Sequence, residues 1–303
     1  MGNITILMGL YNGEKFVREQ LDSFVAQTHR DWSLIVSDDG STDDGPEIVR
    51  AFADAHPEHN IRLIDGPRQG FAQNFVHLLT QTDSDYVAFA DQDDVWLPHK
   101  LAYALSHLPA PDQAAIVCGR TALVDENLQP LGQSPLFTRG PSFGNALVQN
   151  IGGGNTMVLT RAALALLHSA APHAKDIVSH DWWVYQVLTG CGAQVIYDPK
   201  PGLLYRQHSG NLIGANTLAA ERLARLRMLL GGIYAAWAEM TITSLTPLTD
   251  QLTPDAQAQL AAFTKARAAP LSRRLRLMHQ SGIRRQTRLG TLALWVTVIL
   301  GWI

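Results

Sequence analysis

The densest group of acidic side chains in this 303-residue sequence is Asp91-Gln92-Asp93-Asp94, directly after the apolar run Tyr86-Val87-Ala88-Phe89-Ala90. Three carboxylates within four residues repel one another, and a bound divalent cation relieves that repulsion. Side chains alternate along an extended strand end, so Asp91 and Asp93 face the same side and can hold one ion together. The alternative is a solvated turn whose aspartates cap the next helix.

A second acidic pair, Asp38-Asp39, ends another predicted strand and precedes Gly40-Ser41. One carboxylate can accept the ring N–H of a uracil or thymine, and its neighbour can accept a ribose hydroxyl. A helix cap ahead of Pro46 is the alternative, and it would use only one of the two aspartates.

Two further polar groups lie in the second half of the chain. His180-Asp181-Trp182-Trp183 places a carboxylate at the start of a predicted apolar helix, where the tryptophans would shield it from water and favour a general base. Tyr205-Arg206-Gln207-His208 offers a guanidinium for a diphosphate and an imidazole for a metal ion. The alternatives are a helix-capping aspartate and an ordinary surface or core histidine.

The elements that must position these groups alternate between strand and helix over the first 100 residues. We predict strands at 4–8, 32–37, 61–64 and 86–90, and helices at 16–27, 46–55 and 72–79. This alternation predicts a mainly parallel sheet with helices on both faces. Ligands of such sheets bind beyond the carboxyl ends of the strands, which is where Tyr11-Asn12, Asp38-Asp39, Gln69-Gly70 and residues 91–94 fall.

The middle of the chain has a weaker pattern. We predict strands at 115–118, 121–124, 156–159 and 194–197, helices at 161–168 and 182–188, and a helical region at 217–240. Residues 130–145 are rich in Pro, Gly and Ser and are predicted as loop. Gly152-Gly153-Gly154 allows either a close approach of the backbone to a substrate or a plain tight turn.

The composition bounds the class of protein. Apolar residues make up 46% and charged residues 17%, which excludes intrinsic disorder. Two cysteines, Cys118 and Cys191, cannot form a disulfide framework or a cysteine zinc site, and they favour a reducing compartment. The first residues lack the basic stretch and apolar core of a signal peptide, so a cytoplasmic location is predicted.

Charge is distributed unevenly along the chain. The net charge is −3, yet the last 48 residues carry eight Lys or Arg and no acidic residue, which leaves 16 basic and 27 acidic groups in residues 1–255. A basic tail on an acidic body indicates an anionic partner, either a membrane or a nucleic acid. Few stacking aromatics accompany the arginines, which argues against nucleic acid.

The uncharged end, residues 289–303, would form a helix only about 22 Å long, short of a hydrocarbon core of about 30 Å. An interfacial helix is therefore favoured over a full membrane span. Packing on the body of the protein or on a second subunit is the alternative.

Taken together, Tyr11-Asn12-Gly13, the stretch 38–43, residues 91–94 and His180-Asp181 resemble glycosyltransferase family 2 in order and spacing. The resemblance covers about residues 4–215. It implies an α/β fold of the GT-A type, with a Rossmann-like, mainly parallel central sheet flanked by helices, and inversion at the anomeric centre. The region of Asn155 and of residues 205–208 is most similar to the rhamnosyltransferase-like subgroup that builds bacterial surface polysaccharides.

The resemblance also implies an organisation. A GT-A catalytic domain would occupy residues 1–215, with a nucleotide-binding half at about 1–110 and an acceptor half at about 111–215. A helical, basic C-terminal extension would follow at 216–303, with an apolar end that associates with the membrane.

The resemblance assigns roles to individual positions. Asp181 would be the catalytic base, with His180 where the commoner motif has Glu. Asp91 and Asp93 would be ligands of Mg²⁺ or Mn²⁺, assisted by His208. The nucleotide would contact Tyr11, Asn12, Asp38, Asp39, Gln69, Gly70, Asn74, Asp91 and Gln92. The diphosphate or acceptor would contact Asp94, Trp96, Gly153, Gly154, Asn155, His180, Trp182 and Arg206.

The expected activity is transfer of one sugar from a nucleotide-sugar, with dTDP-L-rhamnose favoured and UDP-hexoses next, to a saccharide acceptor that is lipid-linked. The sequence lacks the Gln-x-x-Arg-Trp signature of processive synthases. The expected setting is the inner face of the cell membrane, with residues 265–303 on the anionic surface, no nucleic acid, and a homo-oligomer left open. The rival classes are a nucleotidyltransferase, whose phosphate loop would have only Lys15, and a non-catalytic sugar-binding or scaffold protein.

Overall fold

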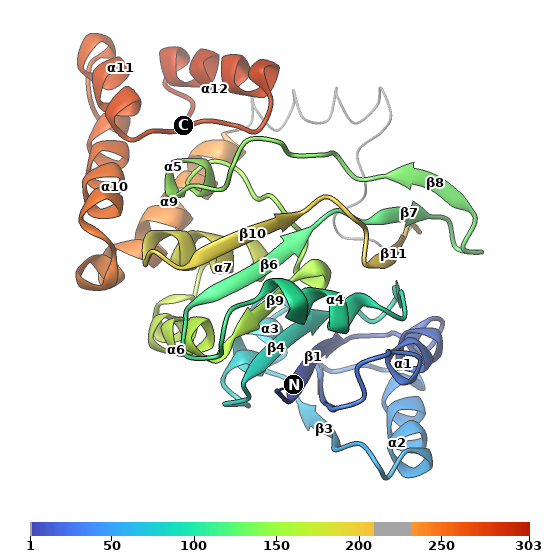
Figure 1. Ribbon diagram of the computed structural model, residues 1–303. Helices are drawn as coiled ribbons and strands as arrows, with labels where there is room; N and C mark the ends of the chain where they lie inside the picture. Colours follow the sequence, from blue (N-terminus) through green and yellow to red (C-terminus); the bar gives the residue numbers. More distant parts are fainter. Residues whose placement is uncertain (1, 209–231) are drawn as a thin grey trace.

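The computed structural model describes residues 2–208 and 232–303, in which a seven-stranded sheet is covered by helices on both faces (Figure 1). The strand order is β10-β6-β9-β4-β1-β2-β3. The strands are β1 (Ile4–Leu10), β2 (Trp32–Asp38), β3 (Ile61–Asp65), β4 (Tyr86–Ala90), β6 (Ala115–Gly119), β9 (Val158–Thr160) and β10 (Gln194–Asp198).

Only β9 runs against its neighbours: it pairs antiparallel with both β4 and β6, whereas the other pairs in this sheet are parallel. The prediction of a mainly parallel sheet is confirmed. Strands β1 and β4 are apolar runs buried almost throughout, as expected where helices cover both faces of a parallel sheet.

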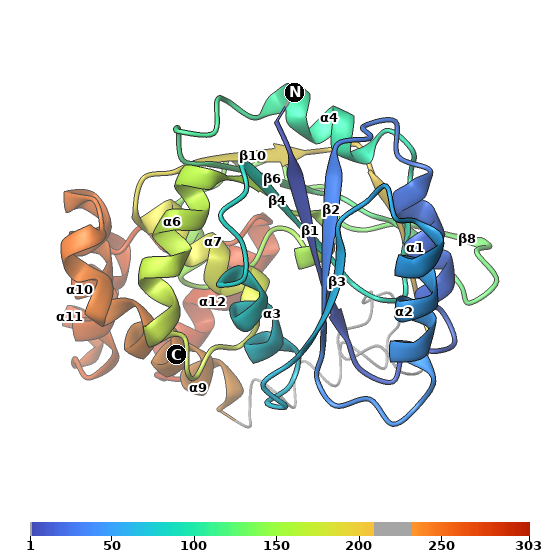
Figure 2. The ribbon, with the colours of Figure 1, turned by 90° about the horizontal axis from the view of Figure 1, so that it is seen from below.

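Each face of the sheet has its own helices (Figure 2). Alternate side chains of β1 show the division, since Ile6 packs with α1, α2 and α4, and Leu7 packs with α3, α6 and α7. The helices of the first layer are α1 (Val17–Val25), α2 (Gly45–Ala55) and α4 (Lys100–His107). Those of the second layer are α3 (Phe71–Leu79), α6 (Arg161–Ala170) and α7 (His180–Gly190).

A smaller sheet corrects the loop predicted at 130–145. Its order is β5-β11-β7-β8, from β5 (Val95–Trp96), β11 (Leu203–Arg206), β7 (Ala122–Val124) and β8 (Pro130–Gln133). Strand β8 is exposed along its whole length and contains Pro and Gly, so its sequence has no strand pattern of its own. Pairing with β7 forms it.

Within the same stretch, helix α5 (Phe143–Ala146) was also missed. It is short, and the Ser142 side chain caps it by accepting a hydrogen bond from the backbone N–H of Asn145. The strand predicted at 156–159 begins later as well, because Gly154–Thr156 forms a 3-10 turn before β9.

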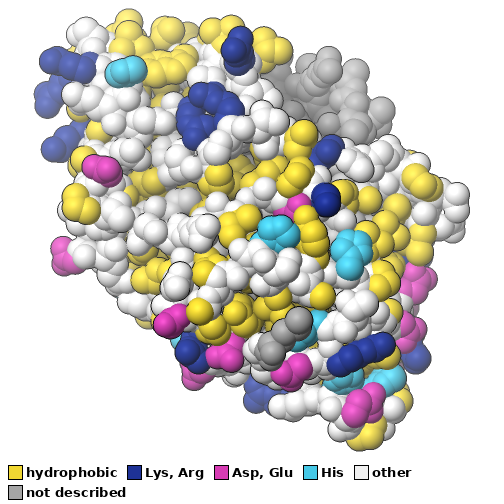
Figure 3. Space-filling model, viewed as in Figure 1, with side chains coloured by type: hydrophobic (Ala, Val, Ile, Leu, Met, Phe, Trp, Pro, Cys, Tyr) yellow, Lys and Arg dark blue, Asp and Glu magenta, His cyan; other side chains and the backbone are white. Residues whose placement is uncertain are grey.

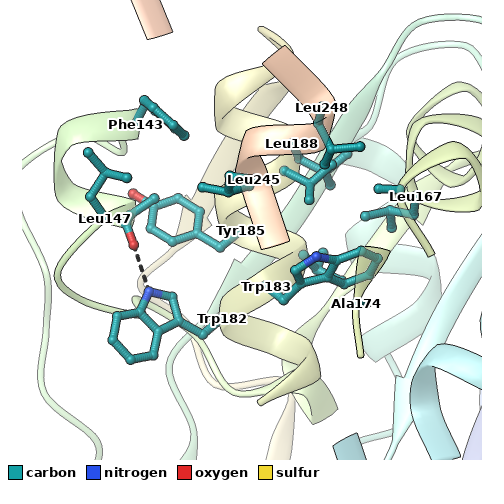
Figure 4. Packing of buried hydrophobic residues seen from close by; sticks show 14 of the residues in the cluster. Phe143, Leu147, Leu167, Ala174, Trp182, Trp183, Tyr185, Leu188, Leu245 and Leu248 are labelled. Atoms are coloured by element: carbon teal, nitrogen blue, oxygen red, sulfur yellow. Dashed lines mark hydrogen bonds between the residues drawn. The ribbon is translucent and has the colours of Figure 1, made fainter. Parts of the chain in front are cut away.

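The C-terminal helices pack on the second layer beside α7 (Figure 1). They are α9 (Ile233–Leu245), α10 (Pro254–Arg267), α11 (Leu271–Gln280) and α12 (Arg288–Leu300), with 3-10 turns at Ala171–His173 and Thr246–Gln251. In the core between α5, α7 and the turn after α9, the Trp182 indole donates to the carbonyl oxygen of Ala146 at 2.7 Å (Figure 4).

No helix within residues 2–208 and 232–303 is both long enough and apolar enough to cross a bilayer. The first part of the helical region predicted at 217–240, and the predicted domain boundary at 215/216, lie outside the described residues. The two-domain division therefore stays a prediction.

Candidate active site

The loops that follow β1, β2 and β4 are hydrogen-bonded to one another at the carboxyl edge of the large sheet. The Gln92 amide accepts from the Tyr11 N–H at 2.8 Å and donates to the Tyr11 carbonyl oxygen at 3.0 Å. Asn12, in the left-handed region at φ 48°, accepts from the Thr42 N–H at 2.9 Å. These contacts hold the backbone of Tyr11 in place, and Tyr11 itself is 58% exposed.

Asp39 fixes the loop between β3 and α3. Its two carboxylate oxygens accept from the Arg68 N–H at 2.6 Å and the Gly70 N–H at 2.7 Å. Gly70 has φ +88°, a conformation that glycine adopts without strain, and α3 starts directly after it. Each oxygen of Asp39 keeps a second lone pair, so the same carboxylate can order this loop and accept from a ligand.

Two other predicted nucleotide contacts are bonded to the protein itself. Asn74 is buried, donates to the Ser37 carbonyl at 2.9 Å and accepts from the Ser37 hydroxyl at 2.5 Å. Asp38 accepts from the Ser41 N–H at 3.0 Å. The structure therefore places Asn74 between α3 and β2, below the loop of Gln69 and Gly70.

Four side chains that could act on a charged substrate lie near one another beyond β4. They are Asp91, Asp93, Asp181 and His208. Asp91 is half-buried, and burial together with the neighbouring carboxylates Asp93 and Asp181 raises its pKa to about 7. The Asp93 carboxylate accepts a hydrogen bond from the His208 ring at 2.7 Å, and both side chains keep some exposure. The four residues come from three distant parts of the sequence: the end of β4, the start of α7 and the end of β11.

Asp94 is directed away from this group, into the interior. It is fully buried and accepts from the Asn155 amide at 2.6 Å and the Arg206 N–H at 3.2 Å. Burial raises its pKa well above the ordinary value for aspartate. The Asn155 carbonyl oxygen in turn accepts from Lys100 at 2.8 Å, so these residues tie the β4 loop to the glycine-rich segment before β9.

Lys100 and Trp96 lie behind the same loop. Both are buried, and the Lys100 ammonium is 3.4 Å from the centroid of the Trp96 ring. Burial lowers the pKa of Lys100 to about 7. The structure therefore places Trp96 in the core under the site, without the exposed surface that a direct substrate contact needs.

Arg206 is 1% exposed and surrounded by protein oxygens. Its guanidinium donates to the carbonyl of Asp93 at 2.9 Å, to the carbonyl of Glu126 at 2.6 Å and to the Glu19 carboxylate at 2.5 Å. It also lies over the Phe16 ring, 4.5 Å from the centroid. These contacts make Arg206 the residue that holds the Asp93 peptide in place.

Asp181 lies in the first turn of α7. The alternative prediction, that it caps this helix, is wrong, because Ser179 occupies the N-cap position. One carboxylate oxygen of Asp181 accepts from the Ser179 hydroxyl at 2.5 Å and from the Trp182 N–H at 2.7 Å. These bonds fix one oxygen of the carboxylate, and the lone pairs of the second oxygen can accept from a substrate.

His180 has a different environment from its neighbour. Its ring is buried and stacked on Phe75, with centroids 3.9 Å apart and planes 15° apart. Burial lowers its pKa to about 4, so it is neutral at pH 7. Neither ring nitrogen has a hydrogen-bond partner among the described residues, and a Cβ on Gly154 would lie 2.3 Å from Nε2. His180 and Gly154 therefore pack against each other in the core.

The donor set fits a hard divalent ion. The two carboxylates suit Mg²⁺ or Mn²⁺, and burial together with the neighbouring carboxylates raises the pKa of Asp91, an effect that a bound cation would offset. Within the described ranges, no three His, Cys, Asp or Glu side chains form a ready-made metal cage. Mg²⁺ commonly takes one or two carboxylates and completes its shell with substrate phosphates and water, so a cage is not required.

Three residues of the site were not predicted from the sequence. Glu19 and Glu126 contact Arg206, and Ser179 contacts Asp181. Glu19 and Arg206 are 187 positions apart, and no local pattern links them. Ser179 had a usable signal, because a serine directly before a helix is a common N-cap.

The fold places acidic groups beyond the carboxyl ends of its parallel strands, which is where enzymes with such sheets bind their ligands. The family model described as Glycosyl transferase family 2 matches residues 5–171, more than half of the chain, so this protein belongs to glycosyltransferase family 2. The chain is 29% identical over 251 residues to the dTDP-rhamnosyl transferase RfbG of Shigella flexneri, covering 78% of this chain and 83% of that protein. It is also 33% identical over 106 residues to the glycosyltransferase EpsE of Bacillus subtilis, covering 35% and 38% of the two chains.

Solved structures agree on the fold. The mannosyltransferase PcManGT of Pyrobaculum calidifontis, in complex with GDP-Man and Mn²⁺, superposes with a TM-score of 0.54 at 18% identity, covering 99% of this chain and 85% of that one. S. aureus TarS 1–349, in complex with UDP-GlcNAc, gives 0.56 at 16% identity, covering 99% and 91%. The predictions of a GT-A fold and of a glycosyltransferase are confirmed.

Proposed function

We propose that this glycosyltransferase moves a single sugar, with inversion, from a nucleotide-sugar to a saccharide acceptor, and that dTDP-L-rhamnose is its donor. The observation that carries the proposal is the proximity of Asp91 and Asp93 to Asp181, at a loop whose Gln92 is hydrogen-bonded to the backbone of Tyr11. The choice of donor is supported by the similarity to a dTDP-rhamnosyl transferase over most of both chains.

In the proposed mechanism Asp181 is the general base. It takes the proton of the acceptor hydroxyl as that oxygen forms a bond to the anomeric carbon, while the bond from that carbon to the diphosphate oxygen breaks and its electron pair leaves with the diphosphate. Ser179 and the Trp182 amide hold one carboxylate oxygen, which aims the other at the acceptor. Neutral His180, packed behind, adds no competing positive charge.

Asp91, Asp93 and His208 would hold Mg²⁺ or Mn²⁺, which when bound neutralises charge on the diphosphate. The chain's own contribution is to fix these ligands: Arg206 holds the Asp93 peptide, and Asp94 and Asn155 anchor the loop from below. Tyr11 offers a face for the base, and Asp39, with Gln69 and Gly70 on the loop that it orders, would contact the nucleoside.

The proposed acceptor is a lipid-linked saccharide, and the proposed setting is peripheral, on the inner face of the cell membrane, through residues 265–303. The support is chemical: the acidic body carries the site, whereas the last 48 residues hold eight basic groups and no acidic one. Such a tail keeps a catalytic pocket at an anionic bilayer, where lipid-linked acceptors are found.

Calorimetric titration with dTDP, UDP and GDP, with Mn²⁺ and then with EDTA, tests the nucleotide site. We expect metal-dependent binding of dTDP that Asp93→Ala abolishes, and transfer from dTDP-L-rhamnose that Asp181→Asn lowers by about a thousandfold while binding persists. Asp83→Ala, on an exposed aspartate, is the matched control and should change neither.

Other outcomes separate the alternatives. Preference for UDP would favour a UDP-hexose donor on the same fold. Nucleotide binding without turnover on any saccharide acceptor would favour a non-catalytic sugar-binding or scaffold role. If the folded protein binds none of the three nucleotides, the proposed function is wrong.

A further inference from the structure

Helix α12 has apolar side chains on two opposite sides. One side, with Leu294, Thr297 and Val298, is buried against the rest of the protein. The other carries an exposed stripe, defined here as Leu289, Leu292, Val296, Ile299 and Leu300. The first four are spaced by three, four and three residues and Leu300 follows Val296 by four, so all five lie on one continuous face of the helix. Leu289 is 79% exposed and Leu292 is 64% exposed.

This stripe is more than the scatter of apolar residues found on soluble surfaces. Five of the ten large apolar side chains that are exposed among the described residues lie on this one 13-residue helix. Single exposed leucines are ordinary, whereas a contiguous apolar face marks a surface that something covers.

Exposed basic side chains lie on α12 and on its neighbour α11. Arg288 opens α12, and Arg273 and Arg276 lie on the neighbouring α11; all three are exposed. Helix α11 is tied to α12 because Arg274 donates to the Val298 carbonyl oxygen at 3.2 Å. In Figure 3 hydrophobic side chains gather along the top edge, where α12 lies in Figure 1, and Lys and Arg side chains lie along the upper left edge, over α10 and α11.

We propose that the exposed stripe of α12, together with Arg273, Arg276 and Arg288, docks on an anionic lipid bilayer with α12 lying in the plane of the interface. The proposal deepens the membrane location given under the proposed function and rests on it for its biological setting. Its physical basis is independent of sugar transfer.

The chemistry selects a bilayer over a second copy of the chain. A symmetric dimer through the exposed stripe would bring the arginines of both copies together, and residues 256–303 contain no acidic side chain to compensate them. Anionic headgroups compensate the same arginines, and the acyl region accepts the leucines.

The fold also determines how α12 can lie. Its 13 residues span only about 20 Å, less than a hydrocarbon core, and its opposite face is held by the protein. The helix can therefore enter the interface on one side without leaving its packing. Leucine side chains would reach the acyl boundary while the arginines stay at the phosphates.

Docking would also orient the active site. A buried polar network joins the segment before α12 to α7: the Asn145 side-chain oxygen accepts from Gln286 at 3.1 Å and from the Tyr185 hydroxyl at 3.1 Å. Helix α7 carries Asp181 in its first turn, four residues before Tyr185. A bilayer that holds α12 thus holds the proposed base at a fixed orientation to the membrane.

Co-sedimentation of the full chain with sucrose-loaded vesicles tests the proposal. We expect binding to phosphatidylcholine vesicles that contain about 30% phosphatidylglycerol, and weak binding to phosphatidylcholine alone. Leu292→Glu should lower the partition coefficient by roughly tenfold or more, because a leucine that would enter the acyl boundary is replaced by a charge that anionic lipids repel. The matched control is Leu131→Glu, an exposed leucine on β8, which should bind like the wild type.

A second pair of variants tests the charges. Arg273→Ala/Arg276→Ala should lower the partition coefficient by roughly tenfold and flatten its dependence on salt. Arg18→Ala/Arg50→Ala removes two exposed arginines from the other end of the molecule and should have no effect. Thermal unfolding of each variant verifies that it is folded.

Three results would overturn the proposal: equal binding to neutral and anionic vesicles, normal binding of Leu292→Glu, or no binding by the folded wild type. Light scattering tests the alternative that the stripe binds a second copy of the chain. A wild-type dimer that Leu292→Glu dissociates would support that alternative. None of these readouts uses a sugar nucleotide, so failure of the docking proposal is distinguishable from failure of the proposed function.

Discussion

The carboxyl edge of the large sheet and the C-terminal helices use polar side chains in opposite ways. At the sheet edge, the important polar groups are buried and bound to residues far away in sequence, as Arg206 is to Glu19. Around α11 and α12, Arg273, Arg276 and Arg288 are exposed. A site that must place a reacting atom needs fixed geometry, whereas a surface that meets a fluid bilayer needs only the right chemistry at the right height.

The same contrast recurs between neighbours at the site. Asp93 and Asp94 are adjacent, yet the first faces His208 with some exposure and the second is fully buried against Asn155. Asp181 and His180 differ in the same way. The motifs therefore combine one residue available to substrate with one that anchors the loop, and only the first kind can exchange with solvent.

Replacing Arg206 with methionine should give the largest effect. It leaves the carbonyls of Asp93 and Glu126 without the donor that they have in the fold and breaks the pair with the half-exposed Glu19, a loss of about 3–5 kcal/mol in the free energy of unfolding. Urea denaturation measures it.

Arg161→Met is the matched control, because Arg161 pairs with Asp85 at 2.7 Å on the surface. An exposed pair contributes about 0–1 kcal/mol. Equal losses in the two variants would contradict the distinction between the buried contacts of the sheet edge and surface charge.

A buried neutral histidine makes stability depend on pH. The folded-state pKa of His180 is about 4, below its unfolded value of about 6.5, so the unfolded chain binds the extra proton between these pH values. The contribution of His180 to the free energy of unfolding is fully present above pH 6.5. About 3 kcal/mol of it is lost as the pH falls to about 4.

Urea denaturation from pH 7 to pH 4 measures this loss. His180→Leu should flatten the pH dependence by that amount, whereas His107→Leu, at an exposed position at the end of α4, should keep the wild-type slope. If both variants follow the wild type, His180 is not a buried neutral group.

Much of the sheet edge could be predicted from sequence because its signals are local. Apolar runs such as Tyr86–Ala90 predicted strands buried on both faces, and the acidic groups after them had to meet at one edge of a parallel sheet. The predicted ends of the helices and strands were within a few residues of those observed for most elements.

The partners of these residues could not be predicted. A buried Arg206 and an exposed one look the same in the sequence, because the difference depends on Glu19 and Glu126 arriving from other elements. His180 gave the same problem: its burial follows from Phe75 and Gly154, which approach only in the folded chain. Strand β8 exists through its pairing with β7 and has no strand pattern of its own.

The smallest predicted effect comes from removing the N-cap of α12, and it tests whether vesicle binding depends on the order of this helix. Thr287 caps α12 by accepting from the Gly290 N–H at 2.9 Å, and Thr253 caps α10 by accepting from the Ala256 N–H at 3.2 Å. Thr287→Ala and Thr253→Ala should each cost about 1 kcal/mol in the free energy of unfolding. Only Thr287→Ala frays the helix that carries the exposed stripe, so it alone should weaken vesicle binding, by roughly two- to fivefold. Thr287→Ser keeps the capping hydroxyl and should bind vesicles like the wild type. Equal vesicle binding by both alanine variants would mean that binding depends only on the charge of this region, and that the order of α12 is irrelevant to docking.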